Sequence, residues 1–254
     1  MEGRQDRVPA QKSGRVRMNR TGITENMSHE DERNLRVKGL ISGMFSVIIM
    51  GIILFLSSGT LKWPMAWVIL IAVGAATVLV TLFCSPDLIV ERMNKQAGAK
   101  DWDMRMVRVM NLFGLLPLLV AGLDMRFGWT GQIPISVQAV ALGIFILGYV
   151  IFSWAMLTNR FFSLVVRIQD EKGHRTVTTG PYRFVRHPGY LGFFLIVITQ
   201  PLVLGSLYAL LPALITAALF VVRTKREDDT LFRELNGYLE YSNKVRYRLI
   251  PGIW

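Results

Sequence analysis

Six long apolar stretches constrain the fold of this chain more than any other feature. They run over residues 40–56, 63–83, 107–123, 133–157, 190–204 and 206–222. Most approach the roughly 17–25 residues that a helix needs to cross a bilayer, whereas helices in soluble cores are usually shorter and polar on one side. Since 52% of the residues are hydrophobic and 19% are charged, a disordered or fibrous chain is excluded. The sequence predicts an all-α, integral membrane helical bundle.

The last two stretches differ from the others because only Gly205 separates them. They contain about 15 and 17 residues, which barely reaches the thickness of a bilayer. We therefore expect a tight helical hairpin, with a cavity at one of its ends.

The net charge of +11 is explained by where the basic residues fall. If six segments cross the membrane and the N-terminus is cytoplasmic, only Lys62 and Arg126 of the 29 Lys and Arg residues lie in the outer turns. Such an asymmetry is typical of multi-pass membrane proteins. We therefore expect both termini in the cytoplasm, and the basic charge requires no nucleic-acid partner.

Composition divides the chain into three parts. Residues 1–38 are polar and of mixed charge, which predicts a disordered cytoplasmic tail. Residues 39–158 hold the N-terminal membrane helices, with an amphipathic interfacial segment at 86–105 that is either a surface-anchored connector or a substrate gate. The polar chemistry collects in a C-terminal core, residues 159–254. One cysteine and three scattered histidines predict no metal site.

The densest group of polar and aromatic residues follows the fourth apolar stretch. Residues 165–178 first suggest a small β-hairpin that turns at Gly173. The run Gly180-Pro-Tyr-Arg-Phe-Val-Arg-His-Pro-Gly-Tyr-Leu-Gly192 comes next. Pro188 can serve as the first residue of a helix, which would put His187 at its cap.

The side chains of this run suit a small molecule that carries both charges. Arg183, Arg186 and His187 offer donors to a carboxylate, and the rings of Tyr182 and Tyr190 suit a purine or an onium group. Alternatively, the arginines are positive-inside anchors and the tyrosines belong to an interfacial aromatic belt. Two prolines, three glycines and a histidine among the aromatics favour a binding site, because an anchor has no use for them.

Two further segments carry polar groups near the end of the chain. Glu227 lies four residues after Arg223, so it is either the arginine's partner on one helix face or a ligand for a hydroxyl or ammonium group. Residues 237–254 alternate basic and aromatic side chains, which predicts a cytosolic cap folded back beneath the bundle at headgroup level.

Four motifs together resemble the isoprenylcysteine carboxyl methyltransferase family, most closely its prokaryotic members. They are Gly180-Pro-Tyr182, Arg186-His-Pro-Gly-Tyr-Leu-Gly192, Glu227-Asp228, and the Gly237-Tyr ending that continues to Pro251. The resemblance covers about two thirds of the chain and implies an integral membrane methyltransferase. Such an enzyme transfers the methyl group of S-adenosylmethionine, held at the cytosolic face, to a lipophilic acceptor such as the carboxylate of a prenylcysteine-like or other lipid substrate.

The resemblance also implies which residues form the site. His187, Tyr190 and Glu227 match the family's cofactor-binding positions most strongly, and the further matches are Gly180, Pro181, Tyr182 and Arg186. Glu227 and Arg186 are the candidates for catalysis. The usual second glutamate of the family is replaced here by Asp228, which leaves the acceptor open.

Three other functions remain as alternatives. A phospholipid amine N-methyltransferase would use the same cofactor with a different acceptor. An NADPH-dependent sterol-type membrane reductase resembles the C-terminal part, but such enzymes usually have Asn where Gly189 lies and are longer. A channel or transporter normally needs ionisable residues at mid-membrane, and the apolar stretches contain almost none.

Overall fold

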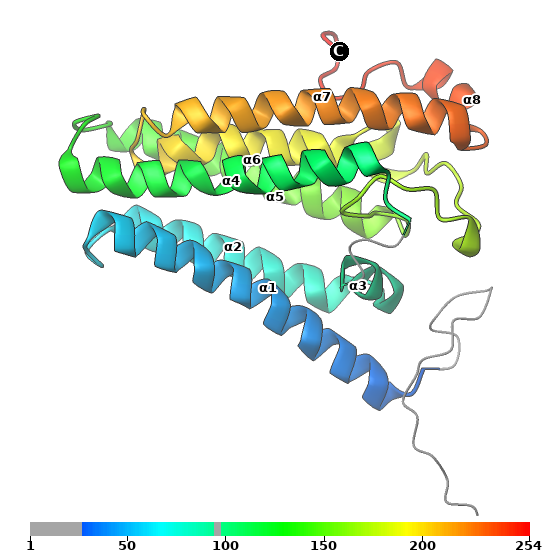
Figure 1. Cartoon of the computed structure of the whole chain (residues 1–254), viewed down its shortest axis with the longest axis horizontal. Coiled ribbons are helices and arrows are strands. Elements are labelled where there is room, and N and C mark those ends of the chain that lie inside the picture. Colours follow the sequence, from blue (N-terminus) through cyan, green and yellow to red (C-terminus); the bar gives the residue numbers. More distant parts are fainter. Residues whose placement is uncertain (1–26, 94–97) are drawn as a thin grey trace, which may run out of the picture.

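The computed structural model describes residues 27–93 and 98–254 as an arrangement of helices, and this part of the chain contains no strand. Its helices are α1 (His29–Ser58), α2 (Pro64–Phe83), α3 (Pro86–Met93), α4 (Asp101–Phe127), α5 (Ile135–Thr158), α6 (Pro188–Leu204), α7 (Leu210–Glu234) and α8 (Tyr238–Lys244), with 3-10 turns η1 (Asp170–Lys172) and η2 (Gly180–Arg183). Figure 1 shows two layers, with α1 and α2 below α4 to α7.

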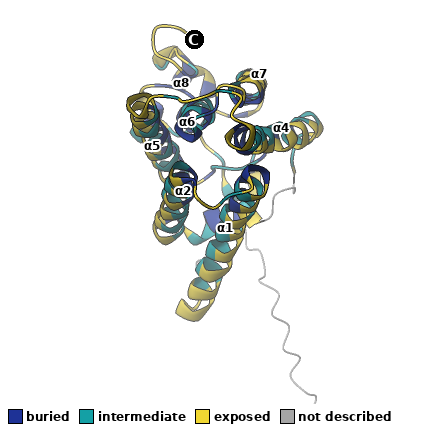
Figure 2. Ribbon diagram, turned by 90° about the vertical axis from the view of Figure 1, so that its left-hand side faces the viewer, coloured by how far each residue is buried: buried dark blue, intermediate teal, exposed yellow. Residues whose placement is uncertain are grey.

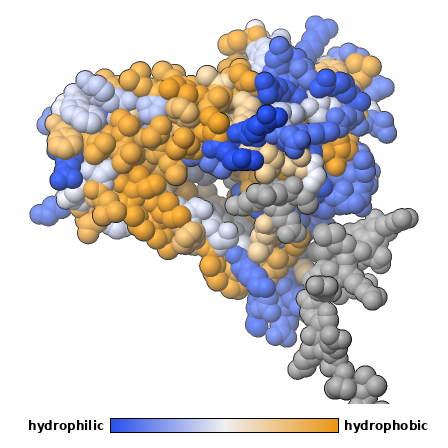
Figure 3. Space-filling view, viewed as in Figure 1, coloured by the Kyte–Doolittle hydropathy of each residue, from blue (hydrophilic) through white to orange (hydrophobic). Residues whose placement is uncertain are grey.

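Four helices, α1, α2, α4 and α5, are long and apolar enough to cross a membrane. Helix α6 is apolar but has 17 residues, and α7 begins apolar and ends polar. Large apolar side chains such as Leu56 and Ile71 point outward, and the surface is hydrophobic over most of the bundle and hydrophilic at the end that carries α8 (Figure 3). The expected all-helical, multi-pass membrane bundle is confirmed, while the count of six crossings stays a prediction.

The closest contact between helices joins α5 to α6, and glycines make it possible. A Cβ atom on Gly148 would lie 2.8 Å from the carbonyl oxygen of Gly192, and one on Gly192 would lie 2.6 Å from that of Gly148. Only glycine allows two backbones to approach so closely. Helix α6 is consequently held inside the upper layer, between α5 and α7 (Figure 2).

The connection between α6 and α7 is longer than the single glycine expected. Gly205 turns the chain with φ 80°, and α7 begins only at Leu210. The hydroxyl of Ser206 explains the extra residues, because it donates to the carboxylate of Asp124 in α4 and accepts from the backbone N–H of Ala209 at 3.1 Å. These bonds tie the connection to α4 at the end of the bundle away from α8.

The N-terminal boundaries also differ from the expectation. Helix α1 begins at His29, where Ser28 caps it by accepting from the N–H of Asp31, so residues 29–38 are helical and not part of a disordered tail. Residues 1–26 of that tail lie outside the described residues. The segment expected at 86–105 contains α3 and the start of α4, so its last residues open a long helix.

The β-hairpin expected at residues 165–178 is wrong. Gly173 does turn the chain, with φ 61°, but the residues before it bond to α4 instead of to a partner strand. The N–H of Val166 donates to the carboxylate of Asp103 at 2.7 Å, and its carbonyl accepts from the N–H of Lys100 at 3.1 Å. A local pattern of apolar residues could not reveal this distant partner.

Candidate functional site

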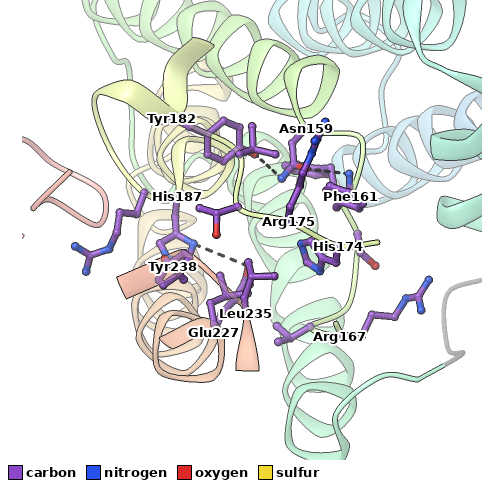
Figure 4. A pocket seen from close by; sticks show the side chains of 18 of the residues that line it. Asn159, Phe161, Arg167, His174, Arg175, Tyr182, His187, Glu227, Leu235 and Tyr238 are labelled. Atoms are coloured by element: carbon purple, nitrogen blue, oxygen red, sulfur yellow. Dashed lines mark hydrogen bonds and ion pairs between the residues drawn. The ribbon is translucent and has the colours of Figure 1, made fainter. Parts of the chain in front are cut away.

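A cavity lies at the polar end of the bundle. It is bounded by the segment 159–187, the first turn of α6, the polar half of α7, and α8. Figure 4 shows His187, Glu227 and Tyr238 on one side, with Tyr182, Asn159 and Arg175 across from them. The site therefore combines residues as far apart in the chain as Asn159 and Tyr241.

The first turn of α6 is held in place by the C-terminal segment. Pro188 is the first residue of α6 and His187 occupies the cap position, as the sequence predicts. The backbone N–H groups of Arg186 and His187 donate to the carbonyls of Tyr247 and Arg248, both at 2.9 Å. Residues 245–248 thus lie against the run that precedes α6.

Asp228 is the centre of the polar network, and its side chain is fully buried. Its carboxylate accepts hydrogen bonds from Arg186 at 2.8 and 2.9 Å, Tyr238 at 2.6 Å and Arg248 at 2.7 Å. Nε2 of His187 lies 3.0 Å away. Burial alone raises the pKa of Asp228, but the hydrogen bonds from His187 and Arg186 outweigh it and hold that pKa well below its usual range. The aspartate is therefore ionised and accepts every bond that it makes.

This network gives Arg186 and His187 different roles. Arg186 uses Nε and Nη2 on Asp228, and Nη1 on the carbonyls of Val245 and Arg246. Few of its donors are left for a ligand. Because ionised Asp228 can only accept, Nε2 of His187 carries the hydrogen, which leaves Nδ1 facing Glu227 Oε1 at 3.9 Å.

Glu227 and Asp228 are adjacent in sequence but lie in different surroundings. The side chain of Glu227 is 23% exposed and lines the cavity, whereas that of Asp228 is 0% exposed. Glu227 accepts a hydrogen bond from the hydroxyl of Tyr190, whose ring stacks on His187 with centroids 5.8 Å apart. The structure therefore brings together Glu227, Tyr190 and His187, the three strongest matches to the motifs.

Arg223 does not pair with Glu227. Its guanidinium binds the carboxylate of Asp103 in α4 at 2.7 and 3.1 Å, and donates to the carbonyl of Leu164 at 2.8 Å. The guanidinium carbon also lies 5.4 Å from the centre of the Tyr190 ring. The interpretation in which Glu227 is the helix-face partner of Arg223 is therefore wrong. The carboxylate of Glu227 instead lines the cavity.

Gly180, Pro181 and Tyr182 form η2, but only Tyr182 lines the cavity. Its hydroxyl donates to the carbonyl of Ala155 at 3.3 Å, and burial raises its pKa. Gly180 has φ 57°, and a Cβ atom there would lie 2.8 Å from Oγ1 of Thr158. Gly180 and Pro181 therefore shape the turn and are not among the residues that line the cavity.

Sequence reasoning missed several residues that line the cavity. They include Arg175, His174, Tyr238 and Tyr241. Tyr238 directly follows Gly237 in the last of the four motifs, so the motif itself contained the signal. Nothing in the local sequence distinguished Arg175, which lines the cavity without a carboxylate partner among residues 27–93 and 98–254.

The residues present fit S-adenosylmethionine better than they fit a metal. No group of three His, Cys, Asp or Glu side chains in the described part of the chain could hold a metal ion. Glu227 offers a carboxylate to a hydroxyl or ammonium group, and Arg175 offers a guanidinium to a carboxylate. The rings of Tyr182, Tyr190 and Tyr238 supply faces suited to an onium charge or a purine.

The fold and the site together define a multi-pass helical membrane protein with an aromatic, charged cavity at one end of its bundle. Residues 141–233 match the family model described as the isoprenylcysteine carboxyl methyltransferase family. The matched range contains α6 and every residue that the motifs predicted for the site. The region from residue 141 to residue 233 therefore matches this family, in agreement with the resemblance seen in the motifs.

Individual relatives agree with the family match. The chain is 37% identical over 113 residues to a probable protein-S-isoprenylcysteine O-methyltransferase of Oryza sativa subsp. indica, covering 43% of this chain and 59% of the relative. It is 35% identical over 111 residues to the protein-S-isoprenylcysteine O-methyltransferase of Schizosaccharomyces pombe, covering 42% and 47%. The matches span about half the length of these relatives.

The similarity to a solved structure is weaker than the similarity to these sequences. The eukaryotic intramembrane Ras methyltransferase (isoprenylcysteine carboxyl methyltransferase) aligns with a TM-score of 0.42 and 16% identity, covering 87% of this chain and 94% of the other. The family assignment depends on the sequence matches alone.

Proposed function

We propose that this protein transfers the methyl group of S-adenosylmethionine to the carboxylate of a lipophilic, prenylcysteine-like acceptor at the cytosolic face of a membrane. The observation that carries this proposal is the convergence of Glu227, Tyr190 and His187 on one cavity within the region that matches the family. The printed names of the relatives, protein-S-isoprenylcysteine O-methyltransferases, support the same reaction.

The cofactor would supply an electrophilic methyl group on a sulfonium. In our proposal, Glu227 accepts hydrogen bonds from its ribose hydroxyls or its ammonium, and Tyr190 holds Glu227 in place. Arg175 binds its carboxylate, and the tyrosine rings face its charged and aromatic parts. Of the other predicted residues, Tyr182 contributes to this wall, and Gly180 and Pro181 shape the turn that carries it.

Arg186 acts through its neighbours in this proposal. It was expected to be a catalytic and cofactor-binding residue, yet its donors are occupied by Asp228 and by backbone carbonyls. Arg186 is a positioning residue that holds Asp228, and Asp228 in turn orients His187. Fixed charges of this kind keep the reacting groups aligned and require no reorganisation during the reaction.

A carboxylate acceptor requires little acid–base chemistry from the protein. It is ionised near neutral pH and attacks the methyl group directly, so the protein mainly aligns the two reactants and excludes water. An amine or hydroxyl acceptor would require a base, for which Nδ1 of His187 and Glu227 are the available groups. The acceptor's chain would reach the cavity from the bilayer, between helices.

Orientation follows from the charge distribution. The polar end of the bundle carries α8, the segment 159–187 and the polar half of α7, which are rich in Lys and Arg. By the positive-inside rule, this charge supports a cytoplasmic position for this end and for both termini, on the side where S-adenosylmethionine is made.

A labelled-methyl assay on the detergent-solubilised protein tests donor and acceptor together. Prenylcysteine analogues and phospholipid extracts are supplied in parallel, and transfer to the prenylcysteine carboxylate is expected. Transfer to phospholipid amines would reject the carboxylate acceptor and favour a phospholipid amine N-methyltransferase. Binding of NADPH with no binding of S-adenosylmethionine would favour the reductase and reject a methyltransferase.

A further inference from the structure

A second and larger cavity, of about 460 Å³, lies between the two layers of helices. We call it the membrane-side cavity, because its walls come from α1, α2, α5 and α6, with α3 at its polar end. Its lining is largely apolar or small, including Gly43, Met50, Val73, Ala76 and Phe193. Figure 3 shows the hydrophobic surface hollowed between the two layers.

One cation reaches this apolar space. Arg92 of α3 lines the membrane-side cavity, and its Nη1 lies 2.9 Å from the sulfur of Met156, a weak acceptor. No carboxylate within residues 27–93 and 98–254 pairs with Arg92. Burial lowers the pKa of the Arg92 guanidinium, although an arginine stays charged at neutral pH.

Among the described residues, the other buried or partly buried arginines have carboxylate partners. Arg186 binds Asp228, Arg223 binds Asp103, and Arg167 binds Glu91 with a shortest distance of 2.7 Å. Glu91 neighbours Arg92 in sequence, but Arg167 and Lys172 occupy its carboxylate. A partly buried cation without an anion costs free energy, so Arg92 is the position where an external anion would be stabilised.

The membrane-side cavity adjoins the cavity of the candidate functional site, which we call the polar cavity. Phe152 lines the first and Phe162 lines the second, and their rings meet edge to face with centroids 5.6 Å apart. Leu164 lines the membrane-side cavity, whereas Ser163 and Val165 on either side of it line the polar cavity. At this point the two cavities are separated by the ring pair of Phe152 and Phe162.

We propose that the membrane-side cavity binds a lipid with a single anionic headgroup, with its chain between the helix layers and its carboxylate on Arg92. Apolar walls and an unpaired guanidinium complement such an amphipathic anion. The same guanidinium repels an ammonium headgroup, so the cavity selects lipid acids over lipid amines. This inference rests on the proposed function in one respect, namely that the bound lipid acid is the methyl acceptor. Arg92 lies outside the matched region, residues 141–233, so this selectivity belongs to this chain's own N-terminal half.

The test measures lipid binding without the cofactor. The full chain in detergent is photolabelled with a single-chain lipid that carries a diazirine in its chain and a carboxylate at its head, and competed with unlabelled lipids of the same chain length. We expect labelling of peptides from α1, α2 or α5. The carboxylate lipid should compete at least tenfold better than the matched trimethylammonium lipid. Equal competition by the two lipids would overturn the proposal.

Three variants separate the effect of charge from that of shape, and a fourth serves as a control. Arg92→Gln should weaken labelling at least tenfold and remove the preference for the carboxylate, and Arg92→Lys should restore part of both. Ala76→Phe should fill the space of the lipid chain and so reduce labelling. The binding that remains should keep its preference for the carboxylate headgroup. Arg105→Gln, at an exposed position of α4, should leave both unchanged. Full labelling in Arg92→Gln would contradict the proposal.

S-adenosylmethionine binding by the same preparations distinguishes the two proposals. If the wild-type chain binds the carboxylate lipid selectively and does not bind S-adenosylmethionine, the proposed function fails and the lipid site remains. If S-adenosylmethionine binds and headgroup selectivity is absent, the lipid site fails and the proposed function remains. Unaltered elution on gel filtration and unaltered S-adenosylmethionine binding by Arg92→Gln show that the variant is folded.

Discussion

The two cavities differ in how the charged side chains around them are paired. Around the polar cavity the most buried carboxylate, Asp228, is surrounded by four partners, and the groups that face open space, Glu227 and Arg175, are more exposed. In the membrane-side cavity, Arg92 is the single cation among the described residues, and within them it is bonded only to a thioether. Fully paired charges build a rigid frame, and charges without an ionic partner are the ones available to a ligand.

The largest expected effect comes from breaking the frame of the polar cavity. Asp228→Ala leaves Arg186 and His187 without their buried partner, and losing one member of a buried ion pair costs about 3–5 kcal/mol. We expect a large drop in the thermal unfolding temperature in detergent, together with loss of S-adenosylmethionine binding. Asp228→Asn, which keeps the shape, should lie between this variant and the wild type. A normal unfolding temperature in Asp228→Ala would mean that the network is not a structural frame.

Glu227 should affect ligand binding more than stability. Hydrogen bonds to charged groups contribute about 1.5–3 kcal/mol, so Glu227→Gln should weaken S-adenosylmethionine binding about tenfold to a hundredfold, measured by calorimetry. Tyr190→Phe should weaken it by about tenfold or less, because Glu227 keeps its charge. The unfolding temperature of Glu227→Gln should stay near that of the wild type. If it fell as far as in Asp228→Ala, the contrast between the two adjacent carboxylates would be refuted.

Arg175 tests whether a charge without an ionic partner in the polar cavity serves a ligand. Arg175→Gln should raise KM for S-adenosylmethionine several-fold with a smaller change in kcat, because it removes a contact to a part of the cofactor that does not react. Arg183→Gln is the matched control, since Arg183 is exposed and does not line the cavity. Equal effects of the two variants would remove Arg175 from the binding site.

The smallest expected effect is a dependence of stability on pH in the segment beside the polar cavity. Burial lowers the pKa of His174 to about 4, an effect that Asp170 opposes and Arg167 assists. Because the folded pKa lies below the unfolded value of about 6.5, the unfolded state binds more protons between these values. The stabilisation is complete above pH 6.5 and is lost as the pH falls towards 4.

The comparison variant His174→Gln should flatten this part of the pH profile. The measurement is the unfolding temperature of both proteins between pH 7 and pH 4. Parallel profiles would show that protonation of His174 does not contribute.

The broad features of the fold could be predicted from the sequence because they depend on local information. The length and apolar character of each stretch determine that the chain forms membrane helices, whatever the neighbouring helices are. The cap at His187 and the turn at Gly173 were also predictable, because each depends on a few adjacent residues. The run from 180 to 192 contained Tyr182, His187 and Tyr190, which line the cavity.

Only the tertiary structure decided which polar groups pair with which. Arg223 binds Asp103, 120 positions away, instead of the nearby Glu227, and Arg186, which lines the cavity, uses its guanidinium on Asp228. Spacing along a helix cannot predict such choices, because a buried charge pairs with whichever opposite charge the packing brings within hydrogen-bonding distance. Arg92 has no carboxylate partner within residues 27–93 and 98–254 for the same reason, because the packing holds nearby Glu91 on Arg167 and Lys172.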